Sequence, residues 1–356
     1  MIAVVGHFGT LYSYATVAGR VAEALRANGM LAGCQNLDES WHPRWAHLNE
    51  SIEKATHLLL VTAPNHYVAG YAQMFGRARS AIFVSPNTDR LDPEHAETIS
   101  AFSLAIAPSR FCAETVVTEQ CAVDSMTVLP LGSPISSALA KVDRALGAPV
   151  RALHFTSDQA WPSRKGTETL LKAWAQRRPG PEAILTIHGP PSLRKSALYA
   201  IADLGIDETV TYEPSGRLGT SDEELAALYE QADLIVAPSR SEGFGMMMLA
   251  ALVAGVPLLT TCNTGHAEFL NLRPGAWLPI PTPQSGPLAF EAGRAPIVDV
   301  GTLAEMLSLA LTPFARDWMM KAGPGLEEAA EPGWGSWDQA SAQWVERLKE
   351  WMEETA

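Results

Sequence analysis

Short apolar runs alternate along the chain with amphipathic stretches of helical length. In the first half, the runs that predict buried strands are Ile2 to Val5, His57 to Thr62, Ala81 to Val84, Leu104 to Ala107 and Met126 to Leu131. Helical spacing of apolar residues separates them, for example over Tyr14 to Asn28 and Tyr71 to Arg79. Continuous apolar runs are typical of parallel strands that helices cover on both faces. The pattern therefore predicts an α/β domain built on a parallel sheet.

The same alternation resumes after Leu146 to Pro149, which we interpret as a linker. The predicted strands there are Arg151 to Phe155, Ala183 to His188, Val210 to Tyr212, Leu234 to Ala237 and Val256 to Thr260. A capping box of Ser221 and Glu224 marks the start of a helix over 222–231. We therefore expect a first domain over 1–148 and a second over 149–336.

The end of the chain has a different character. Residues 323–336 are rich in Gly, Pro and Glu, and Trp337 to Met352 forms an amphipathic helix. Trp344, Leu348 and Trp351 fall on one face of that helix at i, i+4 and i+7. This spacing predicts an apolar stripe that packs into a core.

The stretch from Leu234 to Leu270 carries the most distinctive chemistry. Pro238 and Ser239 end a strand, a glycine turn of sequence Glu-Gly-Phe-Gly follows at 242–245, and an apolar helix begins at Met246. A glycine turn that feeds a helix leaves unpaired N–H groups and the positive end of the helix dipole at one spot, which favours an anion. Glu242 adds a carboxylate acceptor suited to sugar hydroxyls.

This stretch resembles the C-terminal half of retaining GT-B glycosyltransferases of the GT4-like family, glycosyl transferases group 1. The residues that carry the resemblance are Pro238-Ser239, the 242–245 turn, and Ala254-Gly255-Val256-Pro257, in the family's order and spacing. Arg164-Lys165-Gly166, at the start of a helix, is similar to the family's RKG element. The resemblance implies a GT-B fold: two Rossmann-like domains facing a cleft, with the C-terminal helix over 337–356 crossing back to the first domain. It also implies transfer of a sugar from a nucleotide-sugar donor to an acceptor hydroxyl, with retention of the anomeric configuration.

The resemblance also implies roles for particular residues. As catalytic groups, Glu242 holds the hydroxyls of the transferred sugar, and Arg164 and Lys165 neutralise the leaving diphosphate. The residues expected to bind the donor are Gly9, Gly243, Phe244, Gly245, Met246, Asn263 and Thr264. On the acceptor side we expect His7, His66, Asn87 and Asp89, which follow strands of the first sheet at the edge where α/β proteins bind ligands.

Two positions depart from the family pattern. Ala250 stands where the family has a second Glu, which usually holds the ribose of the donor nucleotide. Gln159 stands where many relatives carry an Arg at the phosphate site. We therefore expect donor binding to differ from that of typical members.

Composition and charge narrow the picture. A length of 356 residues fits two domains, and 47% hydrophobic with 18% charged residues argues against disorder. The longest apolar run, Met246 to Leu259, is too short to span a bilayer. Because a strand is predicted directly after Met1, we expect no signal peptide, and four scattered cysteines favour reduced thiols. We therefore expect a cytoplasmic protein.

The sequence has no DxD pattern in a plausible metal position, so we expect catalysis without a metal and no cofactor besides the nucleotide-sugar co-substrate. A net charge of −13 opposes nonspecific attraction to nucleic acid or anionic membrane. We expect the acceptor to be a saccharide or small molecule.

Three alternatives stay open. Arginines at 77, 79, 90 and 110 permit a phage-type DNA glycosyltransferase that acts on hydroxymethylated bases. The departures at Ala250 and Gln159 permit a non-catalytic relative that binds nucleotide sugars. A GT-B sugar-nucleotide epimerase is the third, against which the Glu-Gly-Phe-Gly turn argues.

Overall fold

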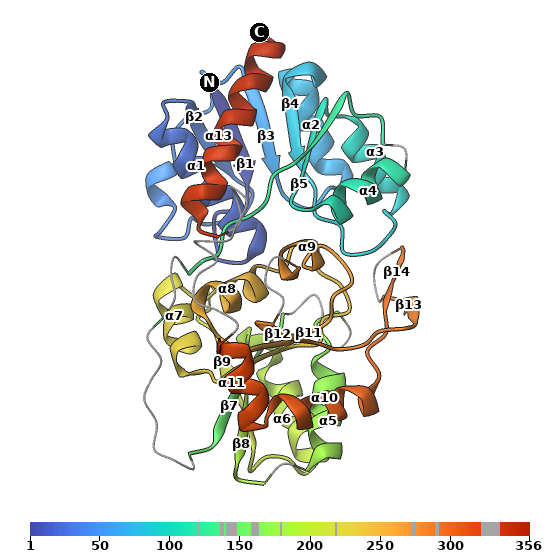
Figure 1. The fold of residues 1–356 in the computed structure, drawn as a ribbon. Coiled ribbons are helices and arrows are strands. Elements are labelled where there is room, and N and C mark those ends of the chain that lie inside the picture. The colour runs from blue at the N-terminus through green and yellow to red at the C-terminus, as the bar shows by residue number, and fades with distance from the viewer. Residues whose placement is uncertain are drawn as a thin grey trace. The chain divides into compact units, whose positions relative to one another are not determined.

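The computed structural model describes residues 1–119, 121–135, 139, 148–157, 164–178, 180–217, 219–271, 275–288, 292–321 and 335–356. The chain forms two compact units (Figure 1). Unit 1 contains Met1–Gly132, Glu291–Gly293 and Pro332–Ala356, and unit 2 contains Ser133–Phe290 and Arg294–Glu331.

Unit 1 is built on a six-stranded parallel sheet in the order β2-β1-β3-β4-β5-β6. Its strands are β1 (Ile2–Gly6), β2 (Leu31–Asn36), β3 (His57–Val61), β4 (Ser80–Phe83), β5 (Leu104–Ala107) and β6 (Ser125–Val128). All five residues of β1 and all five of β3 are buried, as expected for strands that helices cover on both faces.

The helices of unit 1 are α1 (Ser13–Ala27), α2 (His66–Phe75), α3 (Pro93–Ser100), α4 (Arg110–Thr118) and α13 (Trp337–Glu354), with single turns η1 (Ala46–Leu48) and η2 (Arg77–Arg79). The C-terminal helix α13 packs along α1 (Figure 1). Trp344, Leu348 and Trp351 are at most 2% exposed, and the Trp344 indole donates to the carbonyl of Pro130 over 3.2 Å. The predicted apolar stripe is confirmed.

Unit 2 is built on a second six-stranded sheet, in the order β12-β11-β10-β7-β8-β9, in which every pair of neighbouring strands is parallel. Its strands are β7 (Val150–Phe155), β8 (Ala183–Gly189), β9 (Val210–Pro214), β10 (Leu234–Ala237), β11 (Leu258–Thr260) and β12 (Trp277–Pro279). A separate antiparallel hairpin consists of β13 (Ser285–Pro287) and β14 (Arg294–Pro296).

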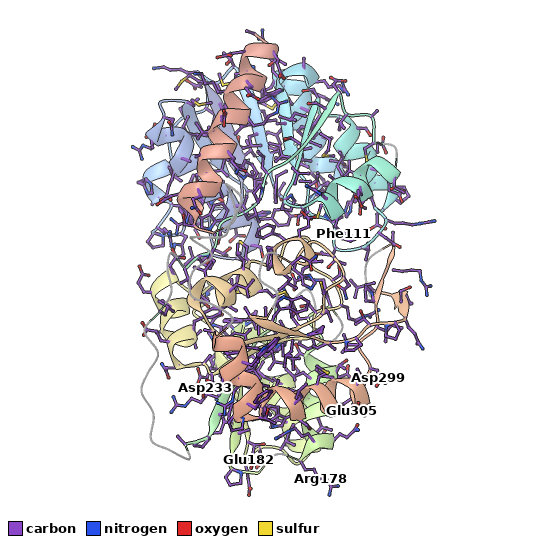
Figure 2. All side chains as sticks on the ribbon, in the orientation of Figure 1. Phe111, Arg178, Glu182, Asp233, Asp299 and Glu305 are labelled. Carbon is purple, nitrogen blue, oxygen red and sulfur yellow. The ribbon has the colours of Figure 1, made fainter. Side chains whose placement is uncertain are left out.

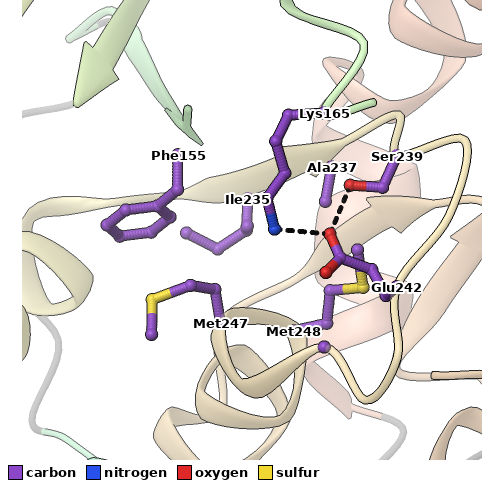
Figure 3. Close-up of a pocket in the computed structure, with 9 residues that line it drawn as sticks. Phe155, Lys165, Ile235, Ala237, Ser239, Glu242, Met247 and Met248 are labelled. Atoms are coloured by element: carbon purple, nitrogen blue, oxygen red, sulfur yellow. Dashed lines mark hydrogen bonds and ion pairs between the residues drawn. The ribbon is translucent and has the colours of Figure 1, made fainter. Parts of the chain in front are cut away.

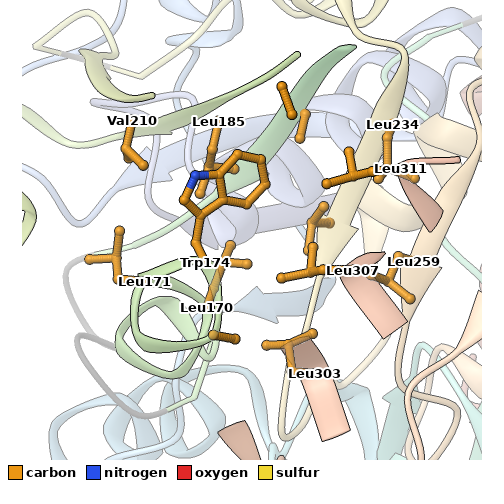
Figure 4. Close-up of a cluster of buried hydrophobic side chains, with 14 of the residues drawn as sticks. Leu170, Leu171, Trp174, Leu185, Val210, Leu234, Leu259, Leu303, Leu307 and Leu311 are labelled. Atoms are coloured by element: carbon orange, nitrogen blue, oxygen red, sulfur yellow. The ribbon is translucent and has the colours of Figure 1, made fainter. Parts of the chain in front are cut away.

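The helices of unit 2 are α5 (Thr167–Arg177), α6 (Arg194–Asp203), α7 (Asp222–Gln231), α8 (Met246–Ala254), α9 (Ala267–Leu270), α10 (Val300–Ala310) and α11 (Pro313–Lys321), with a single turn η4 (Pro191–Leu193). Trp174 on α5 lies in the centre of the core, among leucines from strands and from α10 (Figure 4). Polar side chains fix the ends of these elements. Asp299, labelled in Figure 2, caps α10 by accepting from the Thr302 amide over 2.8 Å, and the predicted capping box of Ser221 and Glu224 is present at α7.

The two Rossmann-like units confirm the expected α/β class, but some elements of unit 1 differ from the prediction. Strand β2 was not expected, because its sequence LAGCQN has little apolar character. Gly33 is required within it, because an added Cβ would lie 2.3 Å from the Glu50 carbonyl oxygen. Helix α2 begins at His66 rather than at Tyr71, since the Asn65 side chain caps it by accepting from the Tyr67 amide. Within the described residues, no helix is long and apolar enough to cross a membrane.

Candidate functional site

The loop between β10 and α8 owes its shape to glycine. Gly245 has φ +92°, and a Cβ there would lie 2.8 Å from the Cβ of His266. Phe244 beside it is 3% exposed and packs against Phe269 with ring centroids 5.5 Å apart. The turn therefore needs glycine both for its backbone conformation and for space, and Phe244 anchors it to α9.

The segment before α5 lies directly against this loop. Gly166 has φ +72°, and an added Cβ would lie 2.2 Å from the carbonyl oxygen of Pro238. The backbone amide of Arg240 donates to the carbonyl of Arg164 over 2.8 Å. The fold thus brings together residues 164–166 and 238–242, which are more than seventy positions apart in the chain.

Glu242 is the centre of this contact (Figure 3). Its Oε1 accepts from Lys165 Nζ over 2.6 Å and from the Ser239 hydroxyl over 2.7 Å. Its Oε2 accepts from an Arg164 Nη over 3.2 Å. The residue is only 6% exposed, and its backbone amide donates to the Thr264 hydroxyl over 2.9 Å. Loop, helix start and carboxylate are therefore held as one hydrogen-bonded unit.

The electrostatics of the cluster follow from these contacts. Burial by itself raises the pKa of Glu242, but Lys165 and Arg164 oppose it and bring the pKa down to about 2. Burial lowers the pKa of Lys165, and the carboxylate opposes that change. The carboxylate is therefore ionised at neutral pH. Two cations face one carboxylate, and this excess of positive charge at the first turn of α8 favours an anion.

The two histidines nearest to the cluster are structural. His266 is fully buried, and its Nε2 donates to the Thr261 carbonyl over 2.8 Å. His154 is 1% exposed, and its Nδ1 donates to the Val236 carbonyl over 2.8 Å. Burial lowers both pKa values to about 4. Both side chains are neutral at pH 7 and hold the strand ends rather than a ligand.

A small pocket opens beside the cluster (Figure 3). Its lining residues are Phe155, Lys165, Ile235, Ala237, Ser239, Glu242, Gly245, Met247 and Met248. Figure 3 shows Lys165, Ser239 and Glu242 grouped together with Met248, and the Phe155 ring and the Met247 thioether apart from them. Such a lining suits a ligand with an anionic or polyhydroxyl part joined to an apolar or flat part.

Three other residues of unit 2 expected around the donor are Met246, Asn263 and Thr264. Met246 begins α8 directly after the glycine turn of Gly243 to Gly245. The Thr264 hydroxyl is engaged with Glu242, and the Asn263 amide donates to the Thr282 hydroxyl over 3.5 Å. Thr264 therefore stabilises the loop by accepting a hydrogen bond from the backbone amide of Glu242.

Ala250 lies on α8 and is fully buried. A glutamate at this position would have to place its carboxylate in packed surroundings or rearrange them. Gln159 lies outside the described residues.

In unit 1, His7 and Gly9 share one partner, Asp38. His7 Nδ1 lies 2.8 Å from Asp38 Oδ1, and the Gly9 amide donates to Asp38 Oδ2 over 2.6 Å. His7 Nε2 lies 2.9 Å from the Thr62 hydroxyl, and the His7 side chain is 40% exposed. These residues follow β1, β2 and β3, which are neighbours in the sheet, so they form a row along its carboxyl edge.

The remaining acceptor-side candidates lie on the same edge of that sheet. His66 starts α2 and pairs with Glu94 of α3, with Nδ1 and Oε1 2.7 Å apart. Asn87 and Asp89 lie in the segment after β4, where Asn87 is half-buried and Asp89 is exposed. His66 therefore has a carboxylate partner different from that of His7.

Sequence reasoning missed Asp38, Thr62, Glu94 and Ser239 as members of these clusters. Asp38 was missed because β2 was not predicted, so its position at a strand end was not visible. Ser239 was expected to end a strand and to belong to the family motif, but no contact with Glu242 was predicted for it. Of the arginines proposed for nucleic acid, Arg77 is paired with a carboxylate: one of its Nη atoms donates to both carboxylate oxygens of Asp124 at 2.7 Å. The described residues contain no group of three or more His, Cys, Asp or Glu arranged to hold a metal.

Comparisons with known proteins bear on the second unit most directly. Residues 151–285 match the family model described as glycosyl transferases group 1. The D-inositol 3-phosphate glycosyltransferase of Pseudarthrobacter chlorophenolicus is 39% identical over 102 residues, which cover 27% of this chain and 23% of that protein. The corresponding enzyme of Nocardia farcinica is 37% identical over 103 residues, covering 27% and 22%. The chain thus spans about a quarter of the length of these curated relatives.

Solved structures match over the whole chain. Anabaena Alr3699/HepE, crystallised with UDP and glucose, superposes with a TM-score of 0.69 at 14% identity, covering 98% of this chain and 99% of that one. Sucrose-phosphate synthase from Thermosynechococcus elongatus gives 0.68 at 16% identity, covering 99% of both. At such low identity these likenesses concern the fold alone, and they confirm the expected GT-B fold of two Rossmann-like domains.

Proposed function

We propose that the protein transfers a sugar from a nucleotide-sugar donor to an acceptor hydroxyl, because residues 151–285 match the model of glycosyl transferases group 1 and the chain has a GT-B fold. The observation that carries the proposal is the buried cluster of Glu242, Lys165 and Arg164 at the start of α8. It combines a polyhydroxyl-binding carboxylate with two diphosphate-binding cations beside one pocket.

The cations serve the leaving group in this proposal. When the bond between the sugar and the diphosphate breaks, negative charge grows on the phosphate oxygens. The Lys165 side chain is 19% exposed and is held by Glu242, so its charge acts in a site of low dielectric without reorganisation. Helix α8 begins at Met246, and the first N–H groups of a helix have no partner within it, so this helix start adds to the stabilisation.

Glu242 serves the transferred sugar. Its carboxylate is fixed by three donors, and the Thr264 hydroxyl holds its backbone amide. Because the pKa is held at about 2, the group is a pure acceptor at neutral pH and binds sugar hydroxyls rather than donating to them. When a diphosphate binds, Lys165 and Arg164 donate to its phosphate oxygens as well as to the carboxylate. Lone pairs on Glu242 then become available to accept hydrogen bonds from the sugar hydroxyls.

The finer parts of the assignment are part of the same proposal. We assign the acceptor to the carboxyl edge of the unit 1 sheet, at His7, His66, Asn87 and Asp89. The anomeric configuration is retained and no metal takes part, as the resemblance implies. The HepE structure was crystallised with UDP and glucose and in a second case with UDP-glucose, which makes nucleoside-diphosphate hexoses the first donors to test.

A panel of nucleotide sugars tests the proposal. The protein is incubated with each donor, with and without simple saccharide acceptors and with a metal chelator in parallel. Release of nucleoside diphosphate and the anomeric proton signals of the product are followed by NMR. We expect one donor to be consumed, unaffected by the chelator, with the product anomer matching the donor. Donor binding without turnover would favour the non-catalytic relative, and absence of both would refute the proposal.

A further inference from the structure

The hairpin of β13 and β14 stands apart from both six-stranded sheets. It pairs only three residues on each strand, Ser285 to Pro287 with Arg294 to Pro296. The family match ends at residue 285, which is the first residue of β13, so all of the hairpin except Ser285 lies beyond the matched region. A two-stranded hairpin is marginally stable alone in water, so this one needs an anchor.

Arg240 supplies that anchor. Its Nε donates to the Pro296 carbonyl over 2.8 Å, and an Nη donates to the carbonyls of Pro287 at 2.9 Å and Gly286 at 3.2 Å. The same Nη lies 3.4 Å from the Ala295 carbonyl. One planar guanidinium thus holds both strands of the hairpin, a geometry that a lysine ammonium does not reproduce. Among the described residues, Arg240 forms no ion pair, so its charge is met by carbonyl dipoles.

The backbone of Arg240 belongs to the catalytic loop. Its amide donates to the carbonyl of Arg164 over 2.8 Å. Ser239, before it, donates to the Glu242 carboxylate, and Ser241, after it, accepts from Arg164 over 3.2 Å. The side chain of Arg240 therefore ties the hairpin to the residues that fix Glu242.

We propose that Arg240 is a positioning residue through which the β13–β14 hairpin sets the conformation of the Glu242 loop. The hairpin acts as a brace beyond the family-matched region: it holds residue 240 from outside, and the hydrogen bonds of residues 239–241 pass that restraint to the carboxylate. This inference rests on the proposed function for its kinetic consequence. Its structural part, coupling between hairpin and loop, stands independently of any activity.

Hydrogen-exchange mass spectrometry tests the structural part. The parent, Arg240→Gln and the matched control Arg294→Gln are compared. Arg294 donates to Ser285 within the hairpin, so its replacement loosens the hairpin without cutting the link to the loop. We expect Arg240→Gln to raise deuterium uptake in peptides covering both 285–297 and 239–245, and Arg294→Gln to raise it in 285–297 alone. Unchanged uptake over 239–245 in Arg240→Gln overturns the inference. Should Arg240→Gln fail to fold, Arg240→Lys, which keeps the charge but loses the fork, replaces it with the same expectation.

A kinetic cycle tests the consequence. A displaced catalytic group costs on the order of tenfold to a hundredfold in rate. We expect Arg240→Gln to lower kcat by about that factor and to leave the Kd of the nucleoside diphosphate within about twofold. In the Glu242→Gln background the same change should lower kcat by less than about threefold, because its target is gone. Additive effects overturn the inference. A parent without turnover on any donor refutes the proposed function instead, and the exchange experiment then still decides whether the hairpin braces the loop.

Discussion

The stability of unit 2 should depend on the ionisation of Glu242 in a way that can be measured without any substrate. The pKa of this carboxyl is lowered from 4.5 to about 2 by Lys165 and Arg164 against the opposing effect of burial. At ~1.4 kcal/mol for each pH unit, this difference corresponds to about 3 kcal/mol of folding free energy. Because the folded-state pKa is the lower one, the contribution is complete above pH 4.5 and is lost as the pH falls toward 2.

Glu242→Gln removes this contribution at every pH, so the comparison of parent and variant isolates it. We expect the gap between their free energies of unfolding to be constant from pH 7 to about 5.5. By pH 3.5 this difference in the free energy of unfolding should have narrowed by about 1 kcal/mol, the share that the linkage relation assigns to this interval. Urea unfolding is carried out at several pH values and is monitored by hydrogen exchange of the amides in β7 and β8. This measurement gives the difference in free energy of unfolding between parent and variant for unit 2 alone.

The matched control is Glu168→Gln. Glu168 also pairs with a lysine, Lys172, but both side chains are about half exposed, so the pair contributes little. The difference in free energy of unfolding between Glu168→Gln and the parent should be small and independent of pH. A gap for Glu242→Gln that does not change between pH 7 and 3.5 would show that the carboxylate is not held by the two cations, and the electrostatic account of the site would be wrong.

Three further predictions concern single residues. Lys165→Ala should weaken binding of a nucleoside diphosphate by roughly 1.5–3 kcal/mol, the worth of a hydrogen bond to a charged group, as measured by calorimetry; unchanged affinity would remove Lys165 from the phosphate site. Gly245→Ala should destabilise unit 2 by more than ~1 kcal/mol, because φ is +92° and the new Cβ meets His266, whereas Gly205→Ala, also at positive φ but in open space, should cost less in the same melting experiment. Ala250→Glu should lower the melting temperature, because the site is fully buried, and a ribonucleoside diphosphate should restore more of that loss than its deoxyribose counterpart; equal recovery would show that position 250 does not face the ribose.

The sequence was sufficient for the architecture because strand and helix signals in this chain are mostly local. Strand β10 and helix α7 begin and end where the pattern placed them, since apolar runs and a capping box mark their ends. Strand β2 was missed because its place in the sheet depends on Gly33 fitting against the backbone of Glu50, a contact between distant residues. Because β2 was not predicted, Asp38 could not be placed at the end of a strand.

The sequence was sufficient to predict which residues belong to the site, but not which of them contact one another. Glu-Gly-Phe-Gly and Arg-Lys-Gly are recognisable as motifs, and the structure joins them through Glu242. That Lys165 and Arg164 pair with this carboxylate depends on how close residues 164–166 and 238–242 approach, which the spacing along the chain does not specify. The role of Arg240 could not be predicted for the same reason. Its partners are carbonyls of a hairpin that no hydrophobic pattern in the sequence predicted.

The most direct test of the account is the effect of Glu242→Gln on turnover and on binding, measured together on the donor that the panel identifies. Glutamine keeps the shape and removes the charge that holds the transferred sugar. We expect kcat to fall by at least about tenfold, while the Kd of the free nucleoside diphosphate changes far less, because the sugar contact exists only when the sugar is present. Turnover equal to that of the parent would contradict the account, since Glu242 would then be a turn residue and not a catalytic one.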